Sequence, residues 1–368
     1  MQATTPIIKK HVVPYPSPST GSRADQITQQ ELALKLGQIF NYESASEFTL
    51  EASSPPTHEY LLPLHTLLLS EAQRLGIQTP QDLYGGVVPY EFVKAKVISH
   101  PLRQASMEAP AGWEHELGHE LRPYTLKGYS AFSVQDAFWV ARGLIHEGPI
   151  RIKLAHSNAS QGQFICTHYT DIPALLQQAA YEPLIEKGVV IEENLTDSTT
   201  YSVGQTEVAG LLISYIGEQR STLNLANKAT YGGTRLLAVR GDYEQLRQTL
   251  DAPLMLEVLE FARQYEQRIF SYYPTLFASR RNYDVIHGRG WDGEMRLGVL
   301  EQSWRMGGAS IAELYALEAL MRDPALTSQH AWTKEEYVPN LDNRTESSHV
   351  YCIAQESDGY LIKSGGLG

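Results

Sequence analysis

Apolar residues recur along the chain with the spacings of both helices and strands. The clearest helix is predicted over 254–272, where an apolar residue returns every three or four positions and forms one continuous stripe. Ser133, followed by Asp136 three residues later, has the pattern of a capping box and predicts the start of a helix that ends before Gly148. Similar signals predict further helices over 32–40, 66–76, 171–180 and 311–321.

Strands are predicted where apolar and polar residues alternate. In Ile150 to Leu154 the apolar side chains lie on one face of an extended strand, and Arg151 and Lys153 lie on the other. Further strands are predicted at 60–64, 164–168, 188–192, 282–286 and 297–303, with an antiparallel pair at 199–205 and 208–216.

Composition and charge exclude several classes of partner. The chain has 368 residues, with 30 basic and 42 acidic side chains and a formal net charge of −12. Nucleic acid or an anionic membrane surface would require a basic face, so neither is expected. The 2 cysteines are too few for a disulfide framework, and no apolar stretch reaches the roughly 18 residues of a membrane span. Without an apolar signal core near Met1, we expect a cytoplasmic protein.

A literal H-E-x-x-H motif occurs at His115 to His119. Two histidines one helical turn apart could bind zinc while Glu116 activates water, which would make a metallohydrolase. Pro110 and Pro123 leave room for only about two turns of helix around the motif. We therefore keep a zinc site as an alternative, beside an exposed polar helix.

A second candidate site involves two neighbouring predicted strands. Alternation places Glu301, Ser303 and Arg305 on one face, and Asp284 lies on the preceding strand. If these strands pair, the two carboxylates converge and suit Mg²⁺, which prefers a few protein oxygens together with substrate phosphate.

Phosphate groups could be held upstream of these carboxylates. Lys153 carries a cation on its strand, and the polar loop from Ser157 to Gly162 offers backbone N–H groups. An ordinary solvated strand face remains the alternative for Arg151 and Lys153.

The order of these features resembles the ATP-grasp superfamily over Lys94 to Ser310, and an uncharacterised bacterial family of about this length with an ATP-grasp-like core. In that superfamily a strand like Arg151-Ile152-Lys153 supplies a phosphate-binding lysine before a glycine-rich lid loop. The loop here, 156–162, has a single glycine. The segment 301–305, followed by Gly307 and Gly308, is similar to the E-x-N-x-R signature, with serine at the asparagine position.

The resemblance implies the role of each candidate residue. The segment 190–195 looks like the interdomain hinge that reads adenine, with Asp197 near the ribose. The implied nucleotide contacts are Lys96 (or Lys94), Lys153, Gln161, Gly162, Glu192, Glu193, Leu195 and Asp197. The implied metal ligands are Asp284, Glu301 and Ser303, the implied catalytic residues are Lys153 and Arg305, and weaker substrate candidates are Arg220, Tyr231, Arg280 and Arg281.

The implied architecture holds the nucleotide between two α+β subdomains. We expect a disordered or extended arm over 1–24, an N-terminal α/β domain over 25–100 and a connector over 101–128. An ATP-grasp lid subdomain over 129–192, a C-terminal subdomain with the metal site over 193–322 and a C-terminal extension over 323–368 complete the expected order.

The activity that the resemblance implies is a ligase reaction with ATP and Mg²⁺ as cofactors. A carboxylate would be activated as an acyl-phosphate and joined to an amine or a thiol, with release of ADP and phosphate. The expected partners are these small-molecule substrates, and a homodimer stays open. Ser303 and the glycine-poor lid keep a non-catalytic nucleotide-binding protein as an alternative to the ligase.

Overall fold

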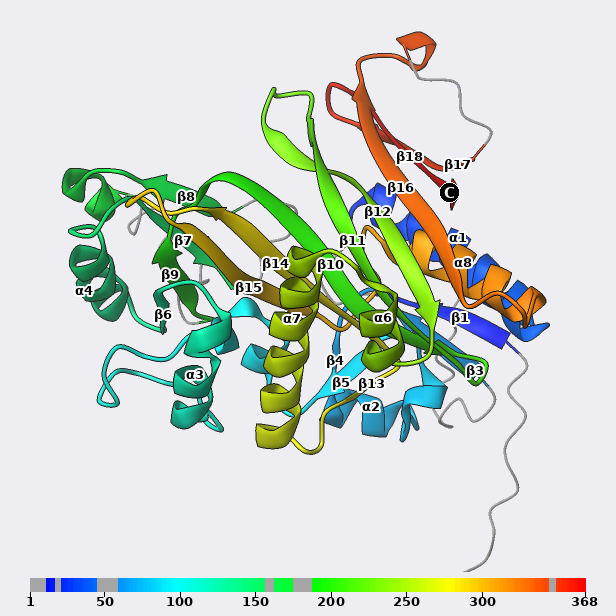
Figure 1. Cartoon of the computed structure of the whole chain (residues 1–368), viewed down its shortest axis with the longest axis horizontal. Coiled ribbons are helices and arrows are strands. Elements are labelled where there is room, and N and C mark those ends of the chain that lie inside the picture. The colour runs from blue at the N-terminus through cyan, green and yellow to red at the C-terminus, as the bar shows by residue number, and fades with distance from the viewer. Residues whose placement is uncertain (1–10, 17–20, 45–58, 156–161, 175–186, 344–348) are drawn as a thin grey trace, which may run out of the picture.

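The computed structural model describes residues 11–16, 21–44, 59–155, 162–174, 187–343 and 349–368. Its centre is a long, twisted sheet of eight antiparallel strands (Figure 1). Their order across the sheet is β15-β14-β10-β11-β12-β16-β18-β17. Their bounds are β10 Thr196–Val208, β11 Leu211–Leu223, β12 Ala229–Arg240, β14 Arg280–Arg289, β15 Met295–Ser303, β16 Ser328–Val338, β17 Val350–Glu356 and β18 Gly359–Leu367.

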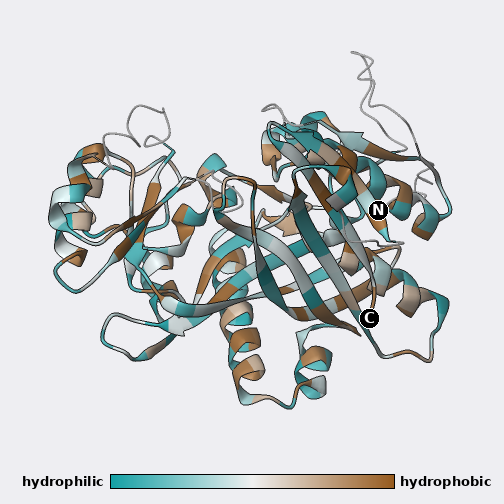
Figure 2. Cartoon of the chain, turned by 90° about the horizontal axis from the view of Figure 1, so that it is seen from above, coloured by the Kyte–Doolittle hydropathy of each residue, from teal (hydrophilic) through white to brown (hydrophobic). Residues whose placement is uncertain are grey.

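Helices cover the two faces of this sheet. On one face, α6 (Tyr243–Thr249) and α7 (Pro253–Tyr272) pack against β10 to β12, β14 and β15, whereas α8 (Ser310–Arg322) covers the other face over β11, β12, β16 and β18. Successive side chains of β14 point to these two faces in turn. Arg280 bonds Glu313 of α8, and Arg281 pairs with Glu266 of α7. Brown and teal stripes lie side by side on the helices in Figure 2, as expected for elements with one buried face.

A smaller sheet, called the lid sheet, lies in the part of the chain that the sequence predicts as the lid subdomain. Its strands are antiparallel, in the order β6 (Gly128–Ala131), β9 (Val189–Glu193), β7 (Ile150–Leu154) and β8 (Gln163–Cys166). The helix α4 (Val134–Leu144) packs on it, with Ser133 as its N-cap as predicted. The helix predicted over 171–180 is described only as far as residue 174, beyond a short 3₁₀ turn at Tyr169–Asp171, and its remainder lies outside the described residues.

The structure corrects the prediction that residues 1–24 form an unpacked arm. Strand β1 (His11–Tyr15) is the central strand of a parallel sheet, between β2 (Glu43–Ser44) and β3 (Glu59–Pro63). Val12 and Val13 are fully buried on its two faces. The helix α1 then begins at Arg23, where Ser22 and Asp25 form a capping box.

The connections around these sheets contain several short elements. The helix predicted over 66–76 is shorter than expected, because Leu67–Leu68 form strand β4 and only Leu69–Arg74 form α2. Strand β5 (Gly86–Val88) pairs with β4 and with β13 (Phe277–Ala278). Short elements also occur in the loops of the described residues. They are helix α3 (His115–Leu121) and the 3₁₀ turns at Pro80–Asp82, Glu91–Lys94, Lys96–Ser99, Arg122–Tyr124 and Leu341–Asn343.

The C-terminal 45 residues, 324–368, also differ from expectation. This segment is predicted from the sequence only as a C-terminal extension without assigned strands, yet β16, β17 and β18 extend the central sheet beyond β12. Alternating exposed and buried positions explain why no apolar run was visible there. Within the described part of the chain, no helix has the length and apolar character needed to cross a membrane.

Candidate functional site

Two carboxylates face each other across the β14–β15 hairpin. Asp284 of β14 and Glu301 of β15 are direct partners in the antiparallel register, and Ser303 lies opposite Asn282 on the same face. Burial, reinforced by the nearby charge of Glu301, raises the pKa of Asp284 to about 6. The strand pairing predicted from sequence is therefore confirmed, and it brings the two carboxylates together.

Three cations lie near Glu301. The Lys96 Nζ atom is 2.8 Å from Glu301 Oε2, and its ammonium is buried. Burial alone would raise the pKa of Glu301, but the charge and hydrogen bond of Lys96, with smaller effects from Lys153 and Arg305, hold it below its usual value. Lys153 therefore acts on the same carboxylate from the lid sheet.

Lys153 also belongs to a buried cluster inside the lid. Its ammonium contacts one carboxylate oxygen of Glu192 on the neighbouring strand β9, and His100 Nε2 lies 3.0 Å from the other oxygen. The side chains of Glu192 and His100 are each 1% exposed. Although burial would raise the pKa of Glu192, Lys153 and His100 together lower it to about 2. Glu192 is therefore a charged group inside the protein, stabilised from two sides.

The carboxylate pair fits a hard divalent cation. Asp284 Oδ1 accepts hydrogen bonds from Gln219 and Asn282, and Glu301 Oε2 is engaged by Lys96. In the described residues no hydrogen bond reaches Asp284 Oδ2 or Glu301 Oε1. The same residues contain no cluster of three or more His, Cys, Asp or Glu side chains suited to a metal. Two carboxylates without a closed protein cage suit Mg²⁺, which shares its coordination with substrate phosphate and water.

The two candidate phosphate lysines near position 95 lie in different surroundings. Lys94 pairs with Glu91 at 2.7 Å and is partly exposed, whereas Lys96 is buried against Glu301. The structure therefore brings Lys96, not Lys94, to the carboxylates.

The remaining nucleotide candidates surround the end of β9. Leu195 is buried, and Glu193 lies 3.8 Å from Arg296. Asp197 is exposed and adopts a positive φ of 45°. Gly162 also has a positive φ, of 63°, and Gln161 lies outside the described residues, as does the rest of the predicted lid loop at 156–160.

Of the four weaker substrate candidates, two arginines are committed to other contacts. Arg280 is 1% exposed and forms a bidentate ion pair with Glu313, with Nη2–Oε1 at 2.6 Å and Nε–Oε2 at 3.1 Å. Its Nη1 atom donates to the backbone carbonyls of Ser303 and Arg305. Arg281 faces α7, on the side of β14 opposite Asp284. The structure does not support a substrate contact for either.

The other two weaker candidates lie elsewhere on the central sheet. Arg220 is exposed on β11. Tyr231 is packed against Gly308, where an added Cβ would lie 2.4 Å from the ring, and its hydroxyl bonds Thr234 and Thr333. Tyr231 therefore borders the glycine turn that follows Arg305.

The H-E-x-x-H motif lies on α3, a short helix of 7 residues. His115, Glu116 and His119 are all exposed, and Leu117, Gly118 and Leu121 turn inward. No third ligand joins them among the described residues. The exposed polar helix is the interpretation that the geometry favours.

Sequence reasoning missed three residues that contact the site. Asn282 could have been found, because it lies two positions before Asp284 and so shares its strand face. Gln219 and His100 reach the site from distant segments, and no local pattern marks either of them.

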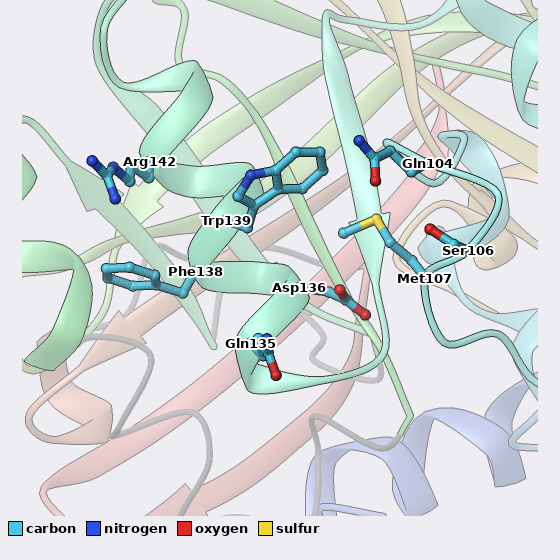
Figure 3. A pocket seen from close by; sticks show the side chains of 8 residues that line it. All are labelled: Gln104, Ser106, Met107, Gln135, Asp136, Phe138, Trp139 and Arg142. Carbon is cyan, nitrogen blue, oxygen red and sulfur yellow. The ribbon is translucent and has the colours of Figure 1, made fainter.

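A separate cavity of about 350 Å³ lies between α4 and the connector (Figure 3). None of its lining residues belongs to the predicted nucleotide or metal set. They are Gln104, Ser106, Met107, Gln135, Asp136, Phe138, Trp139 and Arg142.

Comparisons with known proteins agree with this geometry. Residues 12–365 match the model of a family described as "Protein of unknown function (DUF3182)". No curated protein matches the sequence significantly.

Similar solved structures include the biotin carboxylase of Campylobacter jejuni in a β,γ-ATP complex, with a TM-score of 0.55, 10% identity, and coverage of 98% of this chain and 87% of that one. The N5-carboxyaminoimidazole synthetase of Staphylococcus aureus complexed with ADP is similar with a TM-score of 0.54 and 12% identity. The match covers 98% of this chain and 94% of that one. The D-alanyl-alanine synthetase A of Vibrio cholerae is similar with a TM-score of 0.52 and 12% identity. The match covers 81% of this chain and 89% of that one. These likenesses confirm the α+β ATP-grasp fold.

Proposed function

Because the chain belongs to the DUF3182 family and has the ATP-grasp fold, we propose that it is an ATP-dependent ligase. In this proposal a carboxylate substrate takes the γ-phosphoryl group of ATP and becomes an acyl-phosphate. The nitrogen of an amine, or the sulfur of a thiol, then attacks the acyl carbon. The bond from that carbon to the phosphate oxygen breaks, and phosphate and ADP leave.

One observation carries the proposal. Asp284 and Glu301 stand opposite each other on the central sheet, and Glu301 is acted on by the charges of Lys96 and Lys153 from two other segments and of Arg305 just beyond the end of its own strand. Lys96 and Lys153 are buried, whereas Asp284, Glu301 and Arg305 are partly exposed, so a charged ligand can reach the cluster. A magnesium-bound triphosphate supplies the complementary charges, because its phosphates pair with the cations and its metal with the carboxylates.

The chain's own residues would act mainly by positioning and by charge. Lys96 and Lys153 would neutralise phosphate oxygens, and Arg305 would stabilise the negative charge on the acyl-phosphate. Asp284 and Glu301 would hold Mg²⁺, which when bound neutralises charge on the transferring phosphoryl group. Phosphoryl transfer needs little covalent chemistry from the protein, so correct placement accounts for most of the rate.

Glu192 would serve this process by keeping Lys153 in place before the nucleotide arrives. Its carboxylate contacts the lysine directly, and His100 stabilises the carboxylate from the other side. When Lys153 turns to a phosphate, Glu192 keeps its bond with His100 and is not left alone in the interior. The adenine would lie beside this strand end, near Glu193 and Leu195. We also keep the prediction of a cytoplasmic location.

The test is an assay of ADP release by the purified chain with Mg²⁺, ATP, a library of carboxylic acids and an amine or thiol mixture. The proposal expects release of ADP that depends on both the acid and the metal. It also expects Mg-ATP to raise the unfolding temperature, since a ligand that binds only the folded state stabilises it. Absence of both responses at millimolar ATP would refute the proposal.

A second candidate function is nucleotide binding without catalysis. It is favoured by Ser303, whose Oγ atom lies 3.5 Å from Arg280 Nη1, so its short side chain is directed toward a buried cation rather than extended like asparagine. In this case Mg-ATP stabilises the fold, yet no carboxylic acid triggers ADP release. A Ser303→Asn variant that gains no turnover would support this reading, and turnover by the unaltered protein would exclude it.

A further inference from the structure

Asp284 is held on one of its two oxygens by two carboxamides. Gln219 Nε2 lies 2.8 Å from Asp284 Oδ1, and Asn282 Nδ2 lies 2.9 Å from the same oxygen. In the described part of the chain, neither amide has a contact with Asp284 Oδ2. The carboxylate is thus held asymmetrically, and both donors are uncharged.

The contact from Gln219 spans an intervening strand. Gln219 lies on β11, Asp284 lies on β14, and β10 runs between them in the sheet. The Gln219 amide also lies 2.9 Å from the Ser202 hydroxyl of β10, and Ser202 is the direct strand partner of Asp284. One amide nitrogen with two hydrogens can satisfy both acceptors. Its orientation is therefore fixed at two points.

The second amide is oriented by the interior of the protein. Asn282 is 7% exposed, and its Oδ1 atom lies 3.1 Å from the hydroxyl of the fully buried Tyr215. That hydroxyl is also 2.9 Å from Glu313, the partner of Arg280. The oxygen end of the amide thus faces a hydroxyl, and its nitrogen end faces Asp284.

Uncharged hydrogen-bond donors leave the charge of Asp284 available to a cation. A lysine or arginine bonded to Asp284 would compete with a cation for the same charge, as an ion pair does. Amides fix the direction of a carboxylate and leave most of its charge available, which is the usual task of groups that orient metal ligands. Glu301, by contrast, is paired with the charged Lys96.

We propose that Gln219 and Asn282 are positioning residues that hold Asp284 through Oδ1 and direct Oδ2 toward the divalent cation. The proposal rests on the proposed function, because it assumes that Asp284 is a metal ligand. If the two amides only stabilised the sheet, their removal would lower the free energy of unfolding but would leave the affinity of the protein for the metal unchanged.

The experiment measures Mn²⁺ binding by titration calorimetry, with a non-hydrolysable ATP analogue present. The variants are Gln219→Met, which keeps the length of the side chain but removes the donor, and Asn282→Ala. The control is Gln205→Met, because Gln205 is another glutamine of the central sheet, on β10, and bonds a serine, Ser214, and Arg281 without contacting Asp284. Loss of an orienting partner typically weakens metal affinity by about 10-fold to 100-fold.

The expected result is weaker Mn²⁺ binding in Gln219→Met and Asn282→Ala, with Gln205→Met close to the unaltered protein. Nucleotide affinity measured without metal should be unchanged in all three. If one variant does not fold, the other still decides the question. If the unaltered protein binds Mn²⁺ and both variants bind it with the same affinity as the unaltered protein, this inference alone is overturned. Unaltered protein that binds no Mn²⁺ with the nucleotide analogue would overturn the proposed function and the inference together.

Discussion

The ammonium of Lys96 lies 2.8 Å from the carboxylate of Glu301, where the 3₁₀ turn Lys96–Ser99 meets strand β15 of the central sheet. Gln302, the next residue of β15, donates to the carbonyls of Val93 and Ala95 and so fixes the turn that carries Lys96. Two hydrogen bonds from the side chain of Gln302 therefore help to place both the lysine and the carboxylate. We expect a change at either residue to affect nucleotide and metal binding together.

Replacing Glu301 by glutamine should abolish metal-dependent ADP release. The substitution preserves shape but removes the charge paired with Lys96, so we expect at least about a 100-fold loss of activity, comparable to the loss of an electrostatic catalytic group. The measurement is ADP release at several Mg²⁺ concentrations. Glu294→Gln is the matched control, because Glu294 lies on the turn of the same hairpin and is exposed. Equal activity of the two variants would contradict the metal assignment.

Replacing Lys153 by methionine should destabilise the fold as well as weaken ATP binding. The change leaves Glu192 buried without its cation, and removing one member of a buried ion pair typically costs about 3–5 kcal/mol. The double variant Lys153→Met with Glu192→Gln should regain much of this stability, because the remaining buried charge is gone. Urea unfolding measures the first effect and calorimetric ATP titration the second.

ATP affinity shows whether Lys153 has a functional role or only a structural one. The double variant should stay weak in ATP binding although its fold is restored. Recovery of ATP binding together with stability would show that Lys153 serves the fold alone.

The stabilising effect of Glu192 should depend on pH. Its pKa in the folded protein is about 2, below the ordinary value of 4.5, so its stabilisation is present above 4.5 and is lost as the pH falls toward 2. The difference of two to three pKa units corresponds to about 3 kcal/mol near neutral pH. The stability gap between the unaltered protein and Glu192→Gln should therefore shrink by about 1 kcal/mol between neutral pH and about pH 3.5. Urea unfolding at both pH values measures this gap, and a gap that widens in acid would contradict the assignment.

Replacing Arg280 by methionine should cost more stability than replacing an exposed arginine of the same region. Glu313 would lose its cation while fully buried, although the hydroxyls of Tyr84, Thr206 and Tyr215 still contact it, so a loss of about 3–5 kcal/mol is expected. Arg322→Met at the exposed end of α8 is the control, and a surface ion pair contributes about 0–1 kcal/mol. Chemical denaturation of both variants gives the comparison.

Alanine at His115 and His119 should leave ADP release and stability unchanged. Both imidazoles are exposed, and no third ligand joins them in the described residues. Elemental analysis of the unaltered protein should find no stoichiometric zinc. Stoichiometric zinc that disappears in the double alanine variant would revive the metallohydrolase interpretation.

The sequence predicted the elements whose signals are local. The stripe of α7, the cap of α4 and the alternation of β7, β14 and β15 all lie within windows of about ten to twenty residues, and each was confirmed. The convergence of Asp284 and Glu301 followed from pairing two strands adjacent in the chain.

Elements that depend on distant partners could not be predicted. Strand β1 contains Pro14, which usually argues against a central strand, and its place is set by β3 more than forty residues away. The contact between Gln219 and Asp284 depends on the order of the strands in the sheet. The contact between His100 and Glu192 depends on how the connector crosses the lid.

The strands β16 and β18 carry a consequence for engineering the chain. Shortening it at Pro324 would uncover a row of unpaired peptide groups along β12 and part of the apolar side of α8. An exposed strand of that kind readily recruits a second molecule and leads to aggregation. Expression trials should therefore retain residues 324–368.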